Sequence, residues 1–513
     1  MRRILTAGLC GVLLTTGASL GVADDKFDNA WPEKREYADP GITRAMEAVR
    51  AGIADCRDDH TRPVYHFRPP AHWMNDVCGT IYHKGYYHLC YMINPFGDQV
   101  SRMEIWGHAR SKDMVRWEHL PIPFWPNSEP WEDGIYTGGA AINGHGQPMF
   151  FWTANPRRGS GLKRTAAAAV SDDRMVLWKK CPENPLLRRG THGDPKFDGG
   201  WDAPFLFTEK GRTFVIFGAI LGDESVVPIY EALNPELTRW AYRGILFRKS
   251  KREVSDLECQ NFLKLGDQWM LCYSPDGRQM RYHVGPFDLE KFAFTPRVDG
   301  ILDHAFGKET GGMQRGFYAS NVLYTPDGRC VIFAWVSGFR SRGWNGCVSL
   351  PRVVTLGPDG HPRQAPAVEL QKLRGKHVRL EGLTLNDQGR VLDGVRGDTL
   401  EILAKFEPGD AKSFGLDVRR SDDGKSAVTL RYDGRAVNVA GTNVPLELAE
   451  GEDTLDLHVF LDRSVMEVFI NGGRRCVTRV VYPGAEDQGV RVFSQGGKTR
   501  IKSIDVWQIK SIW

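Results

Sequence analysis

Three acidic residues stand just before segments that have the pattern of β-hairpins. Asp76 lies four residues before TIYHKGYYHLCY (80–91), Asp202 three residues before FLFTEKGRTFVIFGA (205–219), and Glu258 three residues before NFLKLGDQWMLCYS (261–274). Acids in equivalent places of a repeated unit converge when the units are arranged in a ring. An ionised Asp that attacks an anomeric carbon and a Glu that protonates the leaving oxygen are the groups that glycoside hydrolysis requires. We therefore predict Asp76, Asp202 and Glu258 as catalytic residues.

Each acid also has an ordinary structural explanation. An Asp that follows an Asn in a loop is commonly a turn or cap residue, and a Glu at the start of a strand commonly faces solvent. The shared position before hairpins favours one common role over three unrelated ones. No Gly-rich phosphate loop, H-E-x-x-H or G-x-S-x-G motif in the sequence points to a different chemistry.

The elements that must position these acids are hairpins that recur along the chain. Two further examples are AAINGHGQPMFFWTA (140–154) and NVLYTPDGRCVIFAW (321–335), and the five hairpins begin about 60 residues apart. A four-stranded blade with generous loops has this length, so the period predicts a five-bladed β-propeller over residues 61–360. The alternative is a set of unrelated hairpins in an ordinary sandwich.

The segments that flank the propeller have different patterns. Residues 24–60 are predicted to form a helical extension, with one helix over 39–58 that Asp39 caps and Pro40 begins. Residues 361–375 contain prolines and a short helical pattern, which is typical of a linker. Plain alternation of apolar and polar residues predicts a separate antiparallel β-sandwich over 376–513. The predicted fold class is all-β.

Composition and charge limit the kind of protein. The 513 residues are 41% hydrophobic and 25% charged, and 67 Lys and Arg against 63 Asp and Glu leave a formal charge of +4. This balance excludes a disordered chain, and nothing in it indicates nucleic-acid binding. Residues 1–23 have the basic start, apolar run and small-residue end of a signal peptide, with a membrane anchor as the alternative. We expect a secreted or periplasmic protein whose mature form is not bound to a membrane.

The cysteines do not indicate a metal site. Nine of the ten lie after the predicted signal peptide, and they are scattered without C-x-x-C pairs. Cys90, Cys272 and Cys330 lie within apolar strand patterns and are expected to be buried. An isolated disulfide stays open, and we expect no metal and no cofactor.

Several segments together resemble a known family. They are HWMNDVCGTIYHKGYYHLCYMINPFGD (72–98), WGHARSKDMVRWEHLPI (106–122), LECQNFLKLGDQWMLCYSP (257–275), RGWNGCVSLPR (342–352) and LHVFLDRSVMEVFINGG (457–473). They are similar to segments of glycoside hydrolase family 32, the invertases, levanases and inulinases, over roughly residues 60–513. The resemblance implies the same architecture that the hairpin period predicts, a five-bladed propeller followed by a sandwich.

The resemblance also implies roles for individual residues. Asp76 is expected to be the nucleophile of a retaining mechanism, and Glu258 the general acid and then the base. Residues expected to contact the sugar or shape its pocket are Trp73, Asn75, Trp106, Thr137 and Cys259. The implied substrate is an oligo- or polysaccharide with terminal β-fructofuranosyl or related furanoside linkages.

The sequence departs from the family pattern at several of these places. Val77-Cys78 replace the family's Pro-Asn, Met92 replaces a Gln, and residues 136–140 differ from its F-S-G-S-A stretch. Ala203 stands where the family has a transition-state-stabilising Asp, while Gly193-Asp194-Pro195 lies about nine residues out of phase. We expect a β-bulge before Pro204 to turn Asp202 into the cavity as a partial replacement.

Three hypotheses follow from these features. The first is a secreted retaining glycosidase that acts on fructofuranosides. The second is a carbohydrate-binding protein on a degenerate glycosidase scaffold, which the replacement of the third Asp favours. The third is a related five-bladed glycosidase with another sugar preference, such as an arabinoside.

Overall fold

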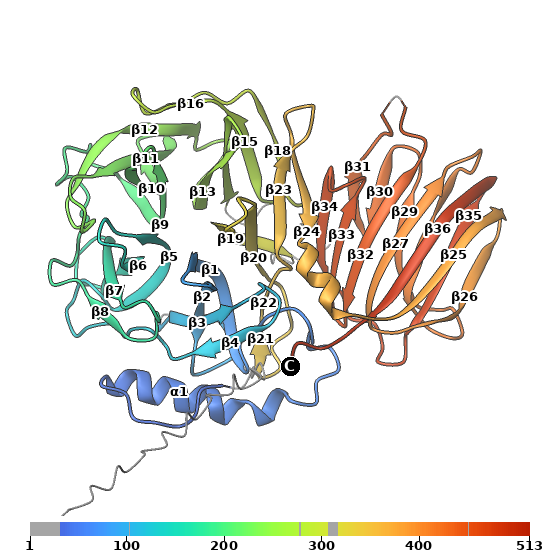
Figure 1. Cartoon of the computed structure of the whole chain (residues 1–513), viewed down its shortest axis with the longest axis horizontal. Helices are drawn as coiled ribbons and strands as arrows, with labels where there is room; N and C mark the ends of the chain where they lie inside the picture. The colour runs from blue at the N-terminus through green and yellow to red at the C-terminus, as the bar shows by residue number, and fades with distance from the viewer. Residues whose placement is uncertain (1–30, 102, 276–278, 306–315, 450) are drawn as a thin grey trace, which may run out of the picture.

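The protein consists of a ring of β-sheets beside a two-layered β-sandwich (Figure 1). The structure is a computed structural model that describes residues 31–101, 103–275, 279–305, 316–449 and 451–513. In this part of the chain, five sheets surround a central axis and two six-stranded sheets form the sandwich. The predicted all-β fold class is confirmed. The proposed signal peptide, residues 1–23, lies outside the described residues.

The first three sheets, or blades, follow one another along the chain. Blade I contains β1 (His72–His83), β2 (Tyr86–Asn94), β3 (Ile105–Ser111) and β4 (Trp117–Leu120). Blade II contains β5 (Gly134–Ile142), β6 (Pro148–Asn155), β7 (Thr165–Ser171) and β8 (Trp178–Lys180). Blade III contains β9 (Gly199–Glu209), β10 (Arg212–Leu221), β11 (Glu224–Ala232) and β12 (Trp240–Ser250). The first strand of each blade lies nearest the axis (Figure 1).

The last two blades complete the ring. Blade IV contains β13 (Leu257–Leu265), β14 (Gln268–Pro275), β15 (Arg281–Gly285) and β18 (Val298–Ile301), and β16 (Phe287–Asp288) pairs with β17 (Ala293–Phe294) beside it. Blade V contains β19 (Phe317–Tyr324), β20 (Cys330–Val336), β23 (Arg352–Leu356) and β24 (Pro362–Pro366), with β22 (Cys347–Val348) also on β20. The ring closes where β21 (Trp344–Asn345) pairs in parallel with β1.

All five predicted hairpins join the two innermost strands of a blade. In β1–β2 and β9–β10 the turns are Lys84-Gly85 and Lys210-Gly211, and all four of these residues have positive φ. Two-residue turns of this kind match the twist of the strands that they connect, and glycine adopts positive φ at little cost. In these two blades, the residues of the turn therefore favour the pairing of the two innermost strands.

A β-bulge interrupts every innermost strand near its start. In β1, residues 75–76 lie opposite a single residue of β2, and residues 136–137, 203–204, 259–260 and 319–320 are the equivalent pairs in the other blades. Ala203, Cys259 and Ala319, the first bulge residues of three blades, have positive φ. A bulge re-aims the side chains on either side of it, which is how all five blades present residues to the axis.

The positions of the bulges show that the three acids do not all occupy equivalent register positions, contrary to the prediction from the sequence. Asp202 and Glu258 are the last paired residues before their bulges, whereas Asp76 is the second residue within its bulge. Asp76 therefore does not share one register position with the other two. The bulge predicted before Pro204 is present, and β9 has a second register shift beside Trp201.

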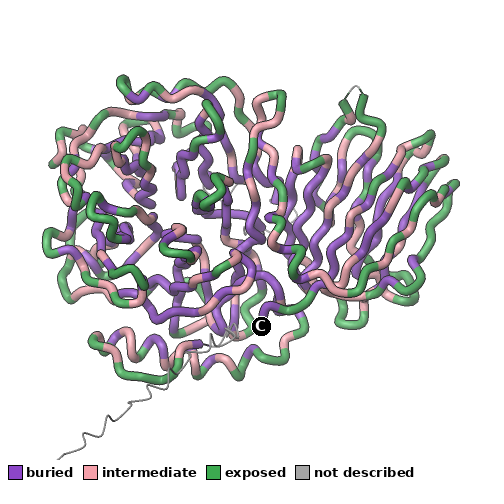
Figure 2. The backbone as a smooth tube through the Cα atoms, viewed as in Figure 1, coloured by how far each residue is buried: buried purple, intermediate pink, exposed green. Residues whose placement is uncertain are grey.

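The sandwich is built from strands of the C-terminal part of the chain. One sheet has the order β25 (Arg374–Asn386), β36 (Lys498–Ile509), β27 (Thr399–Glu407), β32 (Leu455–Asp462), β33 (Val465–Ile470) and β34 (Arg475–Val480). The other has the order β26 (Gly389–Arg396), β35 (Gly489–Gln495), β28 (Ser413–Arg420), β29 (Val428–Tyr432), β30 (Ala436–Val439) and β31 (Thr442–Pro445). The predicted alternation is confirmed, because every second residue of β32 points into the core between the sheets, which is buried in Figure 2.

A helix covers the outside of blade I. α1 (Pro40–Gly52) begins after Asp39, whose side chain accepts a hydrogen bond of 2.7 Å from the Gly41 N–H. It is shorter than predicted, because the chain tightens after Gly52 into a 3-10 turn over Ala54–Cys56. His72 packs so closely that a side chain at Gly52 would overlap its ring. The apolar face of the helix packs against blade I.

A buried ionic network joins the propeller to the sandwich. Arg352 of β23 pairs with Asp303 at 2.8 Å and with Glu467 of β33 at 2.6 Å, and all three side chains are fully buried. His66, which precedes blade I, lies 2.9 Å from Asp462 and 3.1 Å from Glu467 of the sandwich. Hydrogen bonds and charges from these carboxylates outweigh burial and raise the pKa of His66 to about 9. The short connector helix Val368–Leu373 follows this interface.

The nine cysteines of the described residues are free and buried, which confirms the expectation for Cys90, Cys272 and Cys330 and leaves no disulfide among them. In the same part of the chain, no helix has the length and apolar character that a membrane span needs.

Candidate active site

Asp76 lies where side chains from three blades meet. Its Oδ2 accepts a hydrogen bond from the hydroxyl group of Thr137 in blade II and one of 3.4 Å from the thiol of Cys259 in blade IV. Thr137 also lies 3.2 Å from the sulfur of Met92. Thr137 and Cys259, which we expected to contact the sugar, therefore hold the carboxylate of Asp76.

The environment of Asp76 changes its acidity. Burial raises the pKa of Asp76 to about 6, and the charge of Asp202 acts in the same direction. The hydrogen bonds from Thr137 and Cys259 act the other way, because they favour the ionised form. Thr137 and Cys259 together hold Oδ2 of Asp76.

Glu258 lies close to Asp76, because the residue that follows it, Cys259, contacts Asp76 directly. Cys259, the following residue, makes the thiol contact to Asp76, so the bulge in β13 brings the two acids to the same place. The hydroxyl group of Tyr318 donates a hydrogen bond of 2.8 Å to Oε2 of Glu258. Burial raises the pKa of Glu258 to about 7, and the charges of Asp256, Asp76 and Asp202 contribute in the same direction.

The pKa values of both acids are raised. Burial is the largest cause in each case, and it brings the pKa of Asp76 to about 6 and that of Glu258 to about 7. Two interacting carboxyl groups whose environments separate their pKa values are the arrangement of a nucleophile beside a general acid. The half-buried position of both side chains leaves them open to a ligand.

Asp202 belongs to the same group of charges but is already paired. Its Oδ2 accepts a hydrogen bond from Arg164, which precedes β7, and its charge raises the pKa values of both Asp76 and Glu258. Asp202 holds the last paired position before its bulge, the position that Glu258 holds in blade IV. The bulge thus brings Asp202 close to the other acids, as expected, while Arg164 partly neutralises it.

Ala203 has a methyl group where the family has the carboxyl group of an Asp. It is buried in a small apolar cluster with Cys259, Tyr318 and Ala319, all from innermost strands. Its backbone N–H donates to the hydroxyl group of Thr153 over 2.9 Å, which fixes the bulge. Asp194 of the Gly-Asp-Pro segment accepts hydrogen bonds from Tyr230 and from backbone N–H groups of its own loop. Asp194 is therefore engaged within its own loop and by Tyr230.

The three remaining predicted residues take different places. Asn75 is half-buried, and its Oδ1 is buried without a hydrogen-bond partner among the described residues. Trp73 is buried edge-on against Trp335. Trp106 is 0% exposed and donates a 3.0 Å hydrogen bond from its indole N–H to the carbonyl of Tyr136. Trp106 is thus a core residue beside the bulge of β5 and has no exposed surface in this structure.

Sequence reasoning missed three residues of this site. Tyr318 could have been found, because it lies three residues before the fifth hairpin, the spacing of Asp202 and Glu258. Arg164 and Glu104 lie in connections between strands, where the hairpin period carries no information, and Asp76, Asp202 and Arg164 act on Glu104 as neighbouring charges. Their proximity to the acids follows only from the closed ring.

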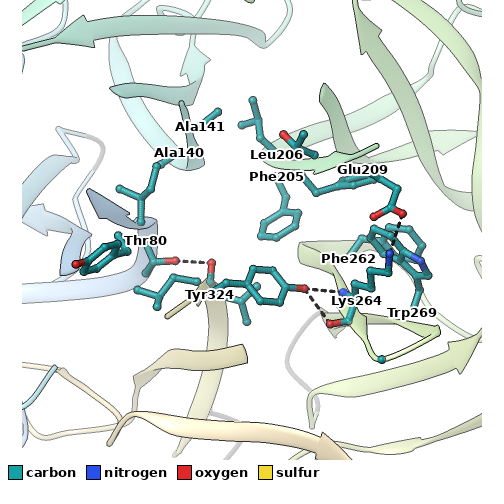
Figure 3. A pocket seen from close by; sticks show the side chains of 17 residues that line it. Thr80, Ala140, Ala141, Phe205, Leu206, Glu209, Phe262, Lys264, Trp269 and Tyr324 are labelled. Carbon is teal, nitrogen blue, oxygen red and sulfur yellow. Dashed lines mark hydrogen bonds and ion pairs between the residues drawn. The ribbon is translucent and has the colours of Figure 1, made fainter. Parts of the chain in front are cut away.

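A separate cavity of about 490 Å³ lies near the hairpin turns, toward the opposite end of the innermost strands (Figure 3). Each innermost strand contributes to its wall, with Thr80, Ala140, Leu206, Phe262 and Tyr324 among the residues. Lys264 forms an ion pair of 2.8 Å with Glu209, and the hydroxyl group of Tyr324 binds the backbone of Lys264. This cavity is distinct from the cluster of acids.

Comparisons with known proteins agree with this geometry. Residues 66–366 match the N-terminal domain of the glycosyl hydrolases of family 32, and residues 369–508 match the C-terminal domain of that family. A levanase of Bacillus subtilis is 28% identical over 527 residues, covering 92% of this chain and 74% of the levanase. A sucrose-6-phosphate hydrolase of Escherichia coli is 25% identical over 498 residues, covering 91% of this chain and 98% of that protein.

A solved structure has the same architecture. Fructan 1-exohydrolase IIa of Cichorium intybus aligns with a TM-score of 0.77 and 21% identity, covering 88% of this chain and 98% of that chain. At this identity the likeness supports the fold. The two family domains together span most of the sequence and contain every predicted site residue, so the chain belongs to glycosyl hydrolase family 32.

Proposed function

We propose that this protein is a retaining β-fructofuranosidase, which cleaves terminal β-fructofuranosyl linkages of a sucrose- or fructan-type substrate. The observation that carries the proposal is the pair Asp76 and Glu258. Cys259, the residue after Glu258, contacts Asp76, and burial raises the pKa values of both acids. The names of the relatives, which include levanases and acid β-fructofuranosidases, support the sugar class.

In the first step, Oδ1 of Asp76 attacks the anomeric carbon of the fructosyl unit. The bond from that carbon to the glycosidic oxygen breaks, and Glu258 transfers its proton to this oxygen, so the leaving group departs as an alcohol. The product is a covalent fructosyl ester of Asp76. Thr137 and Cys259 hold Oδ2, which keeps the nucleophile in one orientation.

In the second step, Glu258 acts as a base. Its carboxylate takes a proton from a water molecule, whose oxygen attacks the anomeric carbon and displaces the ester oxygen of Asp76. Fructose leaves with its original anomeric configuration, and both acids return to their starting states. Retaining chemistry of this kind predicts carboxyl groups about 5–5.5 Å apart in a crystal structure.

The unpartnered Oδ1 of Asn75 supports sugar binding at the same place. A buried acceptor without a donor is unfavourable in the free protein, and a sugar hydroxyl group supplies a donor of the right kind. Because Asn75 immediately precedes Asp76, a sugar held by this amide lies next to the nucleophile.

A carbohydrate-binding protein without activity is the second candidate. The methyl group of Ala203 and the ion pair of Asp202 with Arg164 favour it, because both reduce the free negative charge around the sugar. A glycosidase with another furanoside preference, such as an arabinofuranoside, is compatible with the same pair of acids.

Sugar release by the purified protein distinguishes these candidates. The substrates are sucrose, levan, inulin and an aryl arabinofuranoside, and the Asp76→Asn and Glu258→Gln variants are measured beside the unaltered protein. We expect fructose from at least one fructoside and none with Asp76→Asn. Arabinose alone would assign the third hypothesis, and binding without any release would assign the carbohydrate-binding protein.

We also propose that the protein is exported. Arg2 and Arg3 followed by an apolar run and the small residues Gly21 to Ala23 support this, as does a polymeric substrate that does not cross membranes. Mass spectrometry of the protein recovered outside the cytoplasm should show an N-terminus close to Asp24.

A further inference from the structure

The bulge beside Asp202 is held by side chains of the two neighbouring blades. Ala203, its first residue, has a φ of 54°, a conformation that residues other than glycine adopt only at a cost. The backbone N–H of Ala203 donates to Oγ1 of Thr153 in blade II over 2.9 Å. Its carbonyl oxygen accepts a hydrogen bond of 2.7 Å from Nε2 of Gln260 in blade IV. Blades II and IV therefore fix a backbone segment that lies outside the regular ladder of blade III.

The same backbone segment orients the carboxyl group of Asp202. The N–H of Ala203 also donates to Oδ1 of Asp202 over 2.8 Å, while Arg164 binds Oδ2. Ala203 packs in one apolar cluster with Cys259, whose thiol contacts Asp76. A change of the backbone at Ala203 would therefore move the carboxyl group of Asp202 relative to Asp76.

Gln260 links this bulge to the equivalent bulge of the next blade. It is the second bulge residue of β13, directly after Cys259, and it is 0% exposed. Its Nε2 donates a second hydrogen bond, of 3.2 Å, to the carbonyl oxygen of Ile216 in β10. Both hydrogen bonds of this amide nitrogen go to blade III. Gln260 thus connects the bulge that follows Glu258 to the bulge that follows Asp202.

Stability alone does not account for a glutamine at this position. Oε1 of Gln260 is buried and has no hydrogen-bond partner among the described residues, which is unfavourable. Gln364 shows the fully paired arrangement. Its Nε2 donates to the carbonyl oxygen of Leu302 over 2.6 Å, and its Oε1 accepts 3.1 Å from Arg352. The unpaired oxygen of Gln260 indicates that the bonds of its nitrogen have a further role.

We propose that Gln260 is a positioning residue, which fixes the bulge at Ala203 and thereby the carboxyl group of Asp202. Thr153 assists it from blade II. The inference rests on the proposed function and adds the residues that place the third acid. A carboxylate that is held before the substrate arrives needs no reorganisation as charge develops on the sugar. A misplacement of about 1 Å is enough to cost on the order of 10²-fold in rate.

The test measures Gln260→Met alone and in the Asp202→Asn background, on the best fructoside found. Methionine keeps the length of the side chain and removes the amide that donates. We expect kcat/KM to fall on the order of 10–10²-fold in Gln260→Met. In the double variant we expect little loss beyond that of Asp202→Asn, because the two residues act as one unit.

The pH profile separates positioning from a loss of stability. The charge of Asp202 raises the pKa values of Asp76 and Glu258, so both limbs should move to lower pH when Gln260→Met lets this charge move away. A loss of stability alone shifts neither limb. The substitution leaves unaltered the other titratable groups that act on these acids, which are Arg164, Glu104, Asp256, Cys259 and Tyr318.

Gln364→Met is the matched control. It removes a buried amide of blade V that also donates to a backbone carbonyl, so its melting temperature should fall while its pH profile stays unchanged. Thr153→Val keeps the shape of the side chain and removes the hydroxyl group that accepts from Ala203. It should change kcat/KM and the pH profile in the same direction as Gln260→Met, and it carries the test if Gln260→Met does not fold.

Three results would overturn the inference. The first is an unchanged kcat/KM or an unchanged pH profile in Gln260→Met, or in Thr153→Val where that variant carries the test. The second is a loss from Gln260→Met that is as large in the Asp202→Asn background as alone. The third is an equal shift of the pH profile in Gln364→Met. Failure of the proposed function is distinguishable, because the unaltered protein would then release no fructose at all.

Discussion

The hydroxyl group of Tyr318 in blade V donates a 2.8 Å hydrogen bond to Oε2 of Glu258 in blade IV. Both residues are the last paired positions before the bulges of their innermost strands. The bond favours the ionised form of Glu258 and lowers its pKa, against the larger opposite effect of burial. The pKa of Glu258 therefore depends in part on a residue of the neighbouring blade.

Removing this bond should change the alkaline limit of activity. In Tyr318→Phe the pKa of Glu258 rises, so Glu258 keeps its proton to higher pH and the alkaline limb of the kcat/KM profile moves upward. The acid limb, set by Asp76, stays in place. Tyr324→Phe, which alters a hydroxyl group at the far end of the same strand, serves as the control and should leave both limbs unchanged. A Tyr318→Phe profile identical to that of the unaltered protein would contradict the role of the bond.

The unaltered protein should have a bell-shaped pH profile with its maximum between about pH 6 and 7. The pKa of Asp76, raised to about 6, sets the acid limb, because the nucleophile is protonated and inactive below it. The pKa of Glu258, raised to about 7, sets the alkaline limb, because the acid loses its proton above it. Because Asp76 and Glu258 interact, the two limbs give the apparent pKa values of the pair and not of either residue alone. A rate that rises steadily to pH 9 would be incompatible with Glu258 as the acid.

Asp202→Asn tests the third acid. The charge of Asp202 raises the pKa values of Asp76 and Glu258, so its removal should move both limbs of the profile to lower pH. We expect kcat/KM at the new optimum to fall on the order of 10²-fold if Asp202 stabilises the transition state. Asp194→Asn, which changes an acid of the loop before β9, should keep the normal profile. A near-normal rate in Asp202→Asn would mean that the site works without this carboxylate.

The buried network at the domain interface should be essential for stability. Arg352→Met leaves Asp303 buried without a cation and Glu467 with His66 alone, and the expected loss is about 3–5 kcal/mol of unfolding free energy. Arg396→Met, which breaks an exposed pair with Asp422, should change stability far less, because solvent screens this pair. Urea unfolding followed by tryptophan fluorescence measures both. Equal stability of the two variants would show that the network does not hold the domains together.

The same network gives stability a dependence on pH. The pKa of His66 in the folded protein, about 9, lies above its ordinary value, so its contribution is complete below about pH 6.5 and is lost as the pH rises through 9. The midpoint of urea unfolding should therefore fall over this range, and less so in His66→Gln. A midpoint that falls equally in both proteins would assign the effect to other groups.

The features that could be predicted from the sequence are those that depend on neighbouring residues. Lys84-Gly85 and Lys210-Gly211 define hairpin turns locally, and the side chain of Asp39 caps a helix two residues away. The period of the hairpins predicts the ring, and the three acids that precede hairpins interact with one another in it. Trp106, which the family resemblance placed at the sugar pocket, is buried in the core.

The features that escaped prediction depend on the closed ring. The bulges place Asp76 two register positions later than Asp202 and Glu258, which no count along the sequence shows. Thr137 and Cys259 lie in different blades, and only the fold brings both to Asp76. Arg164 reaches Asp202 from the connection between β6 and β7, which the period of the hairpins does not describe.

Trapping of the fructosyl-enzyme tests the central claim most directly. Glu258→Gln has no base for the second step, while β-fructofuranosyl fluoride needs no acid for the first, so the covalent intermediate should accumulate. We predict that mass spectrometry of the digested protein finds one added hexosyl unit on the peptide that contains Asp76, and none in the double variant Asp76→Asn, Glu258→Gln. Fructosyl fluoride consumed by the Glu258→Gln variant with no adduct on that peptide, or with an adduct on another acid, would contradict the account.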